Sequence, residues 1–319
     1  MILLTGGSGF IGGHFQQHLD SNDLVIFDLD PPVASPAKFI QGDIRKEEDV
    51  RRAIHGNKID AIISLAAKHH DFGIGHDEYF DTNEEGTAVL CKVAGEHGVK
   101  KIVFYSSVAV YGIRGDISTE AMDPRPDSPY GASKLAGEKV LEKWAAEDPS
   151  RKVLIIRPTV VFGPNNMANM KNLIQQIDSG FYFHIGKADN VKSIAYVENL
   201  INATMFLMQR MRPGVSLYNY ADEPQLTTRE IGNHIASFLK KKISFTVPKS
   251  IGILMGKPFD LAIKLTGKNL PISSARIEKL ATQTHHSAQK LFSEGFRPQF
   301  STIDGLQKMV EWYRQEKQQ

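Results

Sequence analysis

A tyrosine and a lysine four positions apart form the pattern with the clearest chemical meaning in this sequence. They are Tyr130 and Lys134, in Pro-Tyr-Gly-Ala-Ser-Lys at 129–134. On a helix such residues share one face, and Ser128 and Pro129 are types favoured at a helix start. A neighbouring ammonium group stabilises a phenolate and lowers the tyrosine pKa from about 10. The pair predicts a general base for a hydroxyl group, although alone it also fits an ordinary helix-surface pair.

A glycine-rich stretch, Thr-Gly-Gly-Ser-Gly-Phe-Ile-Gly-Gly at 5–13, follows a short apolar run. It contains G-x-G-x-x-G from Gly7 and G-x-x-G-x-x-G from Gly6, and both registers share Gly9 and Gly12. Glycine lets the backbone approach a pyrophosphate, and the following helix would offer its free N–H groups to the anion. The stretch predicts a dinucleotide site rather than a glycine-rich turn without a ligand.

An acidic residue stands where such a site needs one. Asp28 ends the apolar run Val-Ile-Phe-Asp, 22 residues after Gly6. A carboxylate at this point accepts hydrogen bonds from the adenosine ribose and repels a 2′-phosphate. NAD is therefore predicted rather than NADP. A solvated acid at a strand end is the alternative, and Asp30 could share the role.

Apolar runs that alternate with helix-length segments must position these residues. The helical segments include 11–19 and 84–98, and the runs that predict buried strands are 2–4, 24–27, 61–65, 102–105 and 153–156. Such alternation predicts an α/β fold with a parallel, doubly wound (Rossmann) sheet.

A second, smaller lobe is expected after Gly163 and Pro164, where the pattern becomes irregular. Helical spacing over 196–208 and a strand-like run at 217–220 indicate a return to the sheet. We therefore expect an NAD-binding domain of residues 1–164 plus about 187–222. Residues of about 165–186 plus 223–319 would form a C-terminal substrate-binding lobe.

Composition excludes several classes of protein. The 319 residues include 38 Lys and Arg against 36 Asp and Glu, so the formal charge of +2 predicts no nucleic-acid partner. A lone cysteine, Cys91, cannot form an internal disulfide, which favours the cytoplasm. The N-terminus does not resemble a secretory signal. The most apolar stretch, 251–265, is interrupted by Gly252 and Pro258, so no membrane span is expected there. We expect a buried helix pair instead, with contact at a membrane surface as the alternative.

A third motif completes a family resemblance. Residues 106–112 read Ser-Ser-Val-Ala-Val-Tyr-Gly after a predicted strand. With the glycine stretch and 129–134, residues 1–210 resemble the extended short-chain dehydrogenase/reductase family, in particular its NAD-dependent nucleotide-sugar epimerases and dehydratases. The resemblance implies NAD as cofactor, a homodimer, and a catalytic set of Ser107, Tyr130 and Lys134, with Lys134 also holding the nicotinamide ribose.

The resemblance also implies contacts with the cofactor. Asp43 and Ile44 would meet the adenine, Asn83 the nicotinamide ribose, and Pro158 and Val161 the nicotinamide. Each position has a core or turn alternative. The predicted cofactor-binding set is Gly6, Gly9, Phe10, Ile11, Gly12, Asp28, Asp43, Ile44, Leu65, Ala66, Ala67, Asn83, Tyr130, Lys134, Pro158 and Val161.

Departures from the family pattern concern the substrate. Val160 replaces a sugar-contacting Asn of many galactose-type epimerases, and His69 stands where a Lys is common. Lys192 could meet a diphosphate as a point charge. Candidate substrate residues are Ser107, His69, Asn169, Lys192 and Arg276. Adjacent histidines on a loop rarely converge on one ion, so no metal is expected at His69 and His70.

The resemblance implies a nucleotide-sugar 4-epimerase for UDP-hexoses or UDP-N-acetylhexosamines, acting by transient oxidation at C4. A nucleotide-4-ketosugar reductase or dehydrogenase is the first alternative, and a non-catalytic nucleotide-binding module is another. Val108 and Ala109 replace the acidic pair of dehydratases, which disfavours that activity. A lipid-diphosphate-linked sugar is also conceivable, and the apolar region 250–265 is its only indication.

Overall fold

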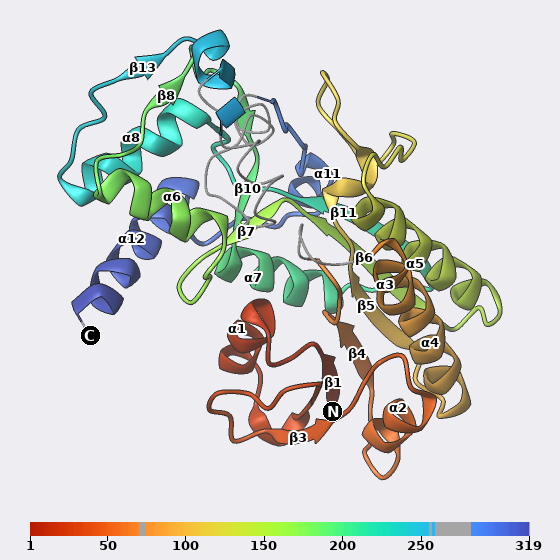
Figure 1. Ribbon diagram of the computed structural model, residues 1–319. Helices are drawn as coiled ribbons and strands as arrows, with labels where there is room; N and C mark the ends of the chain where they lie inside the picture. Colours follow the sequence, from red (N-terminus) through yellow and green to blue (C-terminus); the bar gives the residue numbers. More distant parts are fainter. Residues whose placement is uncertain (70–74, 255–256, 259–281, 319) are drawn as a thin grey trace.

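The computed structural model describes residues 1–69, 75–254, 257–258 and 282–318 (Figure 1). Its central sheet has seven parallel strands in the order β11-β6-β5-β4-β1-β2-β3. The predicted doubly wound sheet is therefore confirmed, including the return of 217–220. The strands are β1 (Ile2–Thr5), β2 (Leu24–Asp28), β3 (Lys38–Gln41), β4 (Ala61–Ser64), β5 (Lys101–Tyr105), β6 (Lys152–Pro158) and β11 (Gly214–Tyr220).

Apolar residues on both faces explain why this sheet is parallel and covered. Neighbouring residues in a strand point to opposite faces. In β1, Leu3 belongs to one buried cluster and Leu4 to another, and Ile62 and Ile63 of β4 divide in the same way. Helices must therefore cover both faces of the sheet.

Two layers of helices provide that cover. One layer consists of α1 (Phe10–His18) and α7 (Val197–Met208), and the other of α2 (Glu47–Ile54), α4 (Gly86–Glu96) and α5 (Pro129–Ala146). Between β4 and α4 lie α3 (His76–Phe80) and η2 (Asp81–Glu85), a π-helical turn.

Helices α6 (Asn169–Asp178), α8 (Thr228–Leu239) and α12 (Thr302–Gln318) pack together, on the left of the view in Figure 1 and away from β1 and β3. Short strands join in pairs: β7 (Val160–Phe162) with β10 (Ile194–Tyr196), β9 (Val191–Lys192) with β12 (Leu226–Thr227), and β8 (His184–Ile185) with β13 (Thr246–Val247). One buried cluster runs from Ile26 in the sheet to Ile174 in α6 and Leu306 in α12, so the interior is continuous. Helix α11 (Gln289–Ser293) precedes α12.

The order of the strands fixes where a ligand can enter. The chain runs outward from β1 through β2 to β3, then returns to form β4 on the other side of β1. Connections leave the carboxyl ends of β1 and β4 in opposite directions, which opens a crevice there.

In the described part of the chain, no helix has both the length and the apolar character needed to cross a bilayer.

Candidate active site

The glycine stretch forms the turn between β1 and α1 at this crevice. Gly6 has φ +70°, and a Cβ on it would lie 2.5 Å from the Ala66 nitrogen beyond β4. A Cβ on Gly12 would lie 2.3 Å from the Gly7 carbonyl oxygen. The first N–H groups of α1 have no partner within the helix, and they begin at this turn. The glycines therefore let the turn pack closely on itself and on the chain after β4, and the start of α1 offers the backbone donors that a pyrophosphate requires.

Asp28 lies beside this turn at the end of β2. One carboxylate oxygen accepts a hydrogen bond from the Ser8 nitrogen at 2.9 Å, and the other accepts from Leu29 at 2.7 Å. The carboxylate is thus fixed before any ligand arrives. A glycine cradle, exposed helix donors and a fixed acid together fit the dinucleotide NAD.

We predict that Gly12→Ala weakens NAD binding at least about tenfold, because the added methyl group would push apart the turn that receives the pyrophosphate. Titration of the purified apoprotein with NAD, followed by calorimetry, measures the change. Gly13→Ala is a matched control, since a Cβ on Gly13 meets nothing within 4 Å. Equal affinities for the two variants would contradict this interpretation of the turn.

The Tyr130–Lys134 pair lies in the first turns of α5. Ser128 caps the helix by accepting from the Gly131 nitrogen at 3.2 Å, and Pro129 follows at the helix start. The Lys134 Nζ lies 4.2 Å from the centroid of the Phe104 ring of β5, and the lysine is 1% exposed. Tyr130 is partly exposed. The predicted helix therefore places the lysine in the interior and the phenol nearer the surface.

Ser107 comes to the same place from the carboxyl end of β5. Its hydroxyl accepts from the Ala109 nitrogen at 3.1 Å and caps η3 (Val108–Tyr111). Helix α5 packs tightly on this turn, since a Cβ on Gly131 would lie 2.4 Å from the Ala109 carbonyl oxygen. This close approach brings Tyr130, directly before Gly131, to the turn that Ser107 caps.

A buried ion pair behind Lys134 is the feature that sequence reasoning missed. Glu138 and Arg157 pair through two hydrogen bonds of 2.8 and 2.5 Å, and their side chains are 2% and 4% exposed. Ser106 donates to the same carboxylate, and Arg157 donates to the Tyr111 hydroxyl at 2.8 Å. Glu138 follows Lys134 by one more helical turn, and this continued i+4 spacing was the available signal.

Burial lowers the pKa of Lys134 to about 7, and the negative charge of Glu138 acts in the opposite direction. In the unfolded chain a lysine has a pKa of about 10.4, so between these values the unfolded state binds more protons. Lys134 therefore costs the apoprotein stability at and below pH 7, and this cost falls as pH rises from 7 towards 10.

We accordingly predict that Lys134→Met raises the thermal midpoint of the apoprotein at pH 7 and abolishes turnover. The apolar side chain occupies similar space without a buried charge. Thermal unfolding at pH 7 and 9 tests this, because the advantage of the variant should shrink at the higher pH. A lower thermal midpoint for the variant than for the parent at pH 7 would show that the buried Lys134 charge does not destabilise the apoprotein.

Other predicted cofactor residues are held by the surrounding chain. Asn83 is buried in η2; its amide donates to the Lys68 carbonyl at 3.1 Å and to Ser133 at 2.9 Å, and its oxygen accepts from the Lys68 nitrogen at 3.0 Å. Asp43 pairs with Arg45 at 2.6 Å, and this hydrogen bond holds the pKa of Asp43 below its usual range. Their contacts with NAD stay predictions. Nearby, Ile44 is buried after β3, Leu65, Ala66 and Ala67 follow β4, Pro158 ends β6 and Val161 lies in β7.

The candidate substrate residues come from separate elements. His69 is exposed beyond β4, Asn169 is exposed at the start of α6, and Lys192 lies in β9. Their convergence on one substrate stays a prediction. Arg276 and His70 lie outside the described residues. Within the described ranges, no three His, Cys, Asp or Glu side chains form a group that could hold a metal ion.

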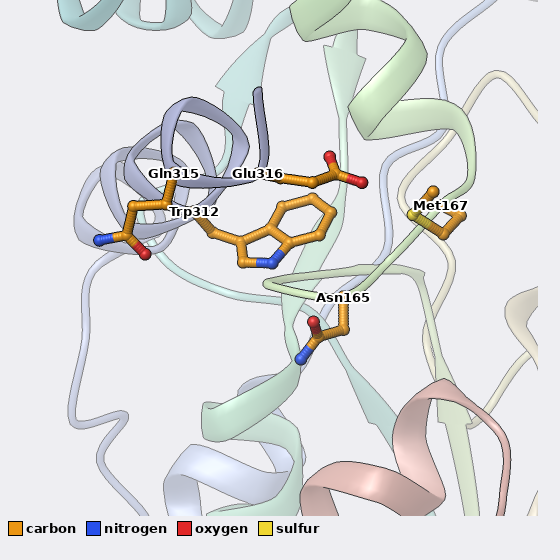
Figure 2. A pocket seen from close by; sticks show the side chains of 5 residues that line it. All are labelled: Asn165, Met167, Trp312, Gln315 and Glu316. Atoms are coloured by element: carbon orange, nitrogen blue, oxygen red, sulfur yellow. The ribbon is translucent and has the colours of Figure 1, made fainter. Parts of the chain in front are cut away.

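A separate hollow lies between α12 and the chain before α6. It has a volume of about 380 Å³ and is lined by Asn165, Met167, Trp312, Gln315 and Glu316 (Figure 2). Lys171 closes its side, with Nζ 2.6 Å from Glu316 and 5.4 Å from the centroid of the Trp312 ring. These contacts join α6 to α12.

The glycine turn, the fixed acid and the Ser-Tyr-Lys set meet at the carboxyl edge of one parallel sheet, which defines the class of dinucleotide-binding α/β enzymes. Residues 2–221 match the family described as the NAD dependent epimerase/dehydratase family. The chain belongs to this family, and NAD is its cofactor.

Individual relatives match along most of their lengths. The chain is 35% identical to the N-acetyl-alpha-D-glucosaminyl-diphospho-ditrans,octacis-undecaprenol 4-epimerase of Escherichia coli O157:H7, over 98% of this chain and 94% of the relative. It is 29% identical to the UDP-glucose 4-epimerase of Vibrio cholerae, over 83% of this chain and 85% of the relative. The solved UDP-glucose 4-epimerase of Thermotoga maritima has the same fold, with a TM-score of 0.79, 23% identity and 99% coverage of both chains.

Proposed function

We propose that the protein is an NAD-dependent 4-epimerase of sugars carried on a diphosphate, with nucleotide sugars as the substrate class. The observation that carries the proposal is that the start of α5, which contains Tyr130 and Lys134, packs on the turn that Ser107 caps after β5, at the sheet edge that holds the glycine turn. The relatives from E. coli and V. cholerae, both named as 4-epimerases, support it.

The roles of the side chains follow from their chemistry. NAD supplies the acceptor, and later the donor, of the hydride at C4 of the sugar. The Tyr130 phenolate takes the proton of the 4-hydroxyl group as the C4–H bond breaks, and the substrate becomes a 4-ketosugar. Ser107 donates a hydrogen bond to the same oxygen, and Lys134 stabilises the phenolate. Once C4 is reduced on its other face, Tyr130 would return the proton to the same oxygen, so the reaction would involve no net oxidation.

The carrier of the sugar diphosphate has two candidates. A nucleoside diphosphate is supported by the V. cholerae relative, named for UDP-glucose. A polyprenyl diphosphate is favoured by the E. coli relative, whose name specifies an undecaprenol-linked sugar and which is similar along nearly the whole chain. Both carriers present the same diphosphate and sugar to the site, so the reaction chemistry is common to them.

The deciding assay incubates the purified enzyme with UDP-glucose, UDP-N-acetylglucosamine or undecaprenyl-diphospho-N-acetylglucosamine, with and without added NADH. We expect the C4 epimer of at least one substrate to form with no net change in NADH absorbance. Stoichiometric loss of NADH with a 4-ketosugar would replace this proposal by the reductase alternative. A folded, NAD-bound protein inert towards all three would contradict the proposal.

The assembly of the enzyme belongs to the same proposal. We propose a cytoplasmic homodimer in which residues 1–164 and about 187–222 bind NAD, and the remaining residues form the substrate lobe. The resemblance of residues 1–210 to the extended short-chain dehydrogenase/reductase family, which implies a homodimer, supports the dimer, and the lone Cys91, which is buried, suits a reducing compartment. Light scattering of the purified chain measures the dimer directly.

A further inference from the structure

The chain from residue 231 to 259 is strongly basic. It contains five lysines and no acidic residue, although the whole chain has a formal charge of only +2. The lysines are Lys240, Lys241, Lys242, Lys249 and Lys257, and all five are exposed. The Lys241 Nζ lies 4.0 Å from an Asp178 carboxylate oxygen, so only the other four lysines are counted as available to a partner. A local excess of positive charge attracts an anionic partner.

Large apolar side chains are exposed between these lysines. Phe245 is 73% exposed, Leu254 is 63% exposed and Ile251 is 49% exposed. Ile251 and Leu254 are three residues apart in the helical turn at 249–254, and this spacing places them on one side of it. Single exposed apolar residues are ordinary, but three large ones within ten residues are unusual and favour a contact surface.

The fold adds a fourth apolar side chain to this group. Strands β8 and β13 are parallel, and the His184 nitrogen donates to the Phe245 carbonyl at 3.1 Å. Phe181, which is 83% exposed, lies just before β8, and Phe245 lies just before β13. Because the two strands are parallel, both phenylalanines lie at the amino end of the strand pair. Figure 1 shows β8 and β13 at the end of the molecule opposite β1 and β3, away from the glycine turn.

We propose that this basic-apolar face docks on the surface of an anionic phospholipid bilayer. We define the face by Phe181, Phe245, Ile251, Leu254, Lys240, Lys242, Lys249 and Lys257. Its apolar side chains would enter the boundary between headgroups and acyl chains, and the ammonium groups would meet lipid phosphates. Protein interfaces are depleted in Lys, which supplies half of the residues of this face; of the types that such interfaces favour, the face contains Phe but no Arg, Tyr or Trp.

Docking goes beyond the proposed function, because it does not depend on which sugar reacts. It also gives a physical route to the lipid-linked candidate substrate. A polyprenyl chain stays in the bilayer, so an enzyme resting on the bilayer surface meets the diphosphate and sugar where they leave the lipid. A water-soluble nucleotide sugar would need no such surface.

Co-sedimentation of the full-length protein with phospholipid vesicles tests the proposal. We expect binding to phosphatidylcholine vesicles that contain phosphatidylglycerol, weak binding to phosphatidylcholine alone, and loss of binding at high salt. A lysine near an anionic surface strengthens binding roughly fivefold, so Lys242→Glu with Lys249→Glu should weaken it at least about 25-fold. Phe245→Ser with Leu254→Ser should also release the protein.

Matched controls place the same changes elsewhere. Lys58→Glu with Lys101→Glu alters two exposed lysines at the amino ends of β4 and β5, and Val33→Ser alters an exposed apolar residue. Both control variants should bind vesicles like the parent. Failure of the folded parent to bind anionic vesicles at low salt overturns the proposal, as does equal binding by face and control variants. A face variant that changes only the oligomeric state, measured by light scattering, assigns the face to a second copy instead. Vesicle binding requires no turnover, so it can succeed even where the epimerase proposal fails.

Discussion

Replacing Tyr130 by Phe should lower kcat by about 10²- to 10⁴-fold, because the variant keeps the ring and loses the group that moves the proton. NAD affinity should stay within about threefold, since the glycine turn and Asp28 lie on other elements. Steady-state rates with the substrate found in the assay above, beside NAD titration by calorimetry, measure both quantities.

Tyr79→Phe is a suitable control for this experiment. Its ring centroid lies 6.3 Å from that of Tyr130, so the change removes a neighbouring hydroxyl from the same region. We expect it to keep most of the activity. Turnover by Tyr130→Phe at the rate of the control would eliminate Tyr130 as the base, and loss of both activity and NAD binding would indicate that the fold had been disturbed.

Glu138→Ala should cost the protein about 3 to 5 kcal/mol of unfolding free energy, because it leaves the Arg157 guanidinium buried without its partner. Urea unfolding with two independent probes measures this cost. Glu142→Ala, on the exposed side of the same helix, should change stability by no more than about 0.5 kcal/mol.

A paired replacement separates the buried charge from the lost contacts. Glu138→Leu with Arg157→Met removes both charges and keeps comparable volume, so it should recover most of the stability lost by Glu138→Ala. A double variant as unstable as the single one would mean that the hydrogen bonds to Ser106 and Tyr111, rather than the unpaired charge, dominate.

Local sequence patterns predicted the sheet because its strands are short, apolar and separated by helical segments. The strand at 2–4 was confirmed as β1, and the run at 217–220 as the end of β11. No range was predicted for β3, whose Lys-Phe-Ile-Gln has a polar residue at each exposed end. The helix expected at 84–98 begins with part of a π-helical turn and ends earlier, where Gly98 has φ +70°.

The predicted active-site residues were found because they belong to compact motifs. The contact between Glu138 and Arg157 could not be found in this way, since it depends on α5 packing across β6. Likewise, nothing in the residues around Asn83 indicated that its amide would donate hydrogen bonds to both the Lys68 carbonyl and the Ser133 hydroxyl. Pairings between distant segments follow from topology rather than from any local pattern.

The unbroken interior that extends from Ile26 to Leu306 has a consequence for how this protein can be divided. A fragment ending near residue 222 would keep the whole glycine turn and the Tyr130–Lys134 pair, yet it would uncover the apolar side chains of α6 and β10 that pack against α12. Such a fragment should aggregate rather than bind nucleotide on its own. A chimaera in which the chain after residue 222 comes from a relative must therefore preserve the apolar contacts between the two parts as well as the reactive residues.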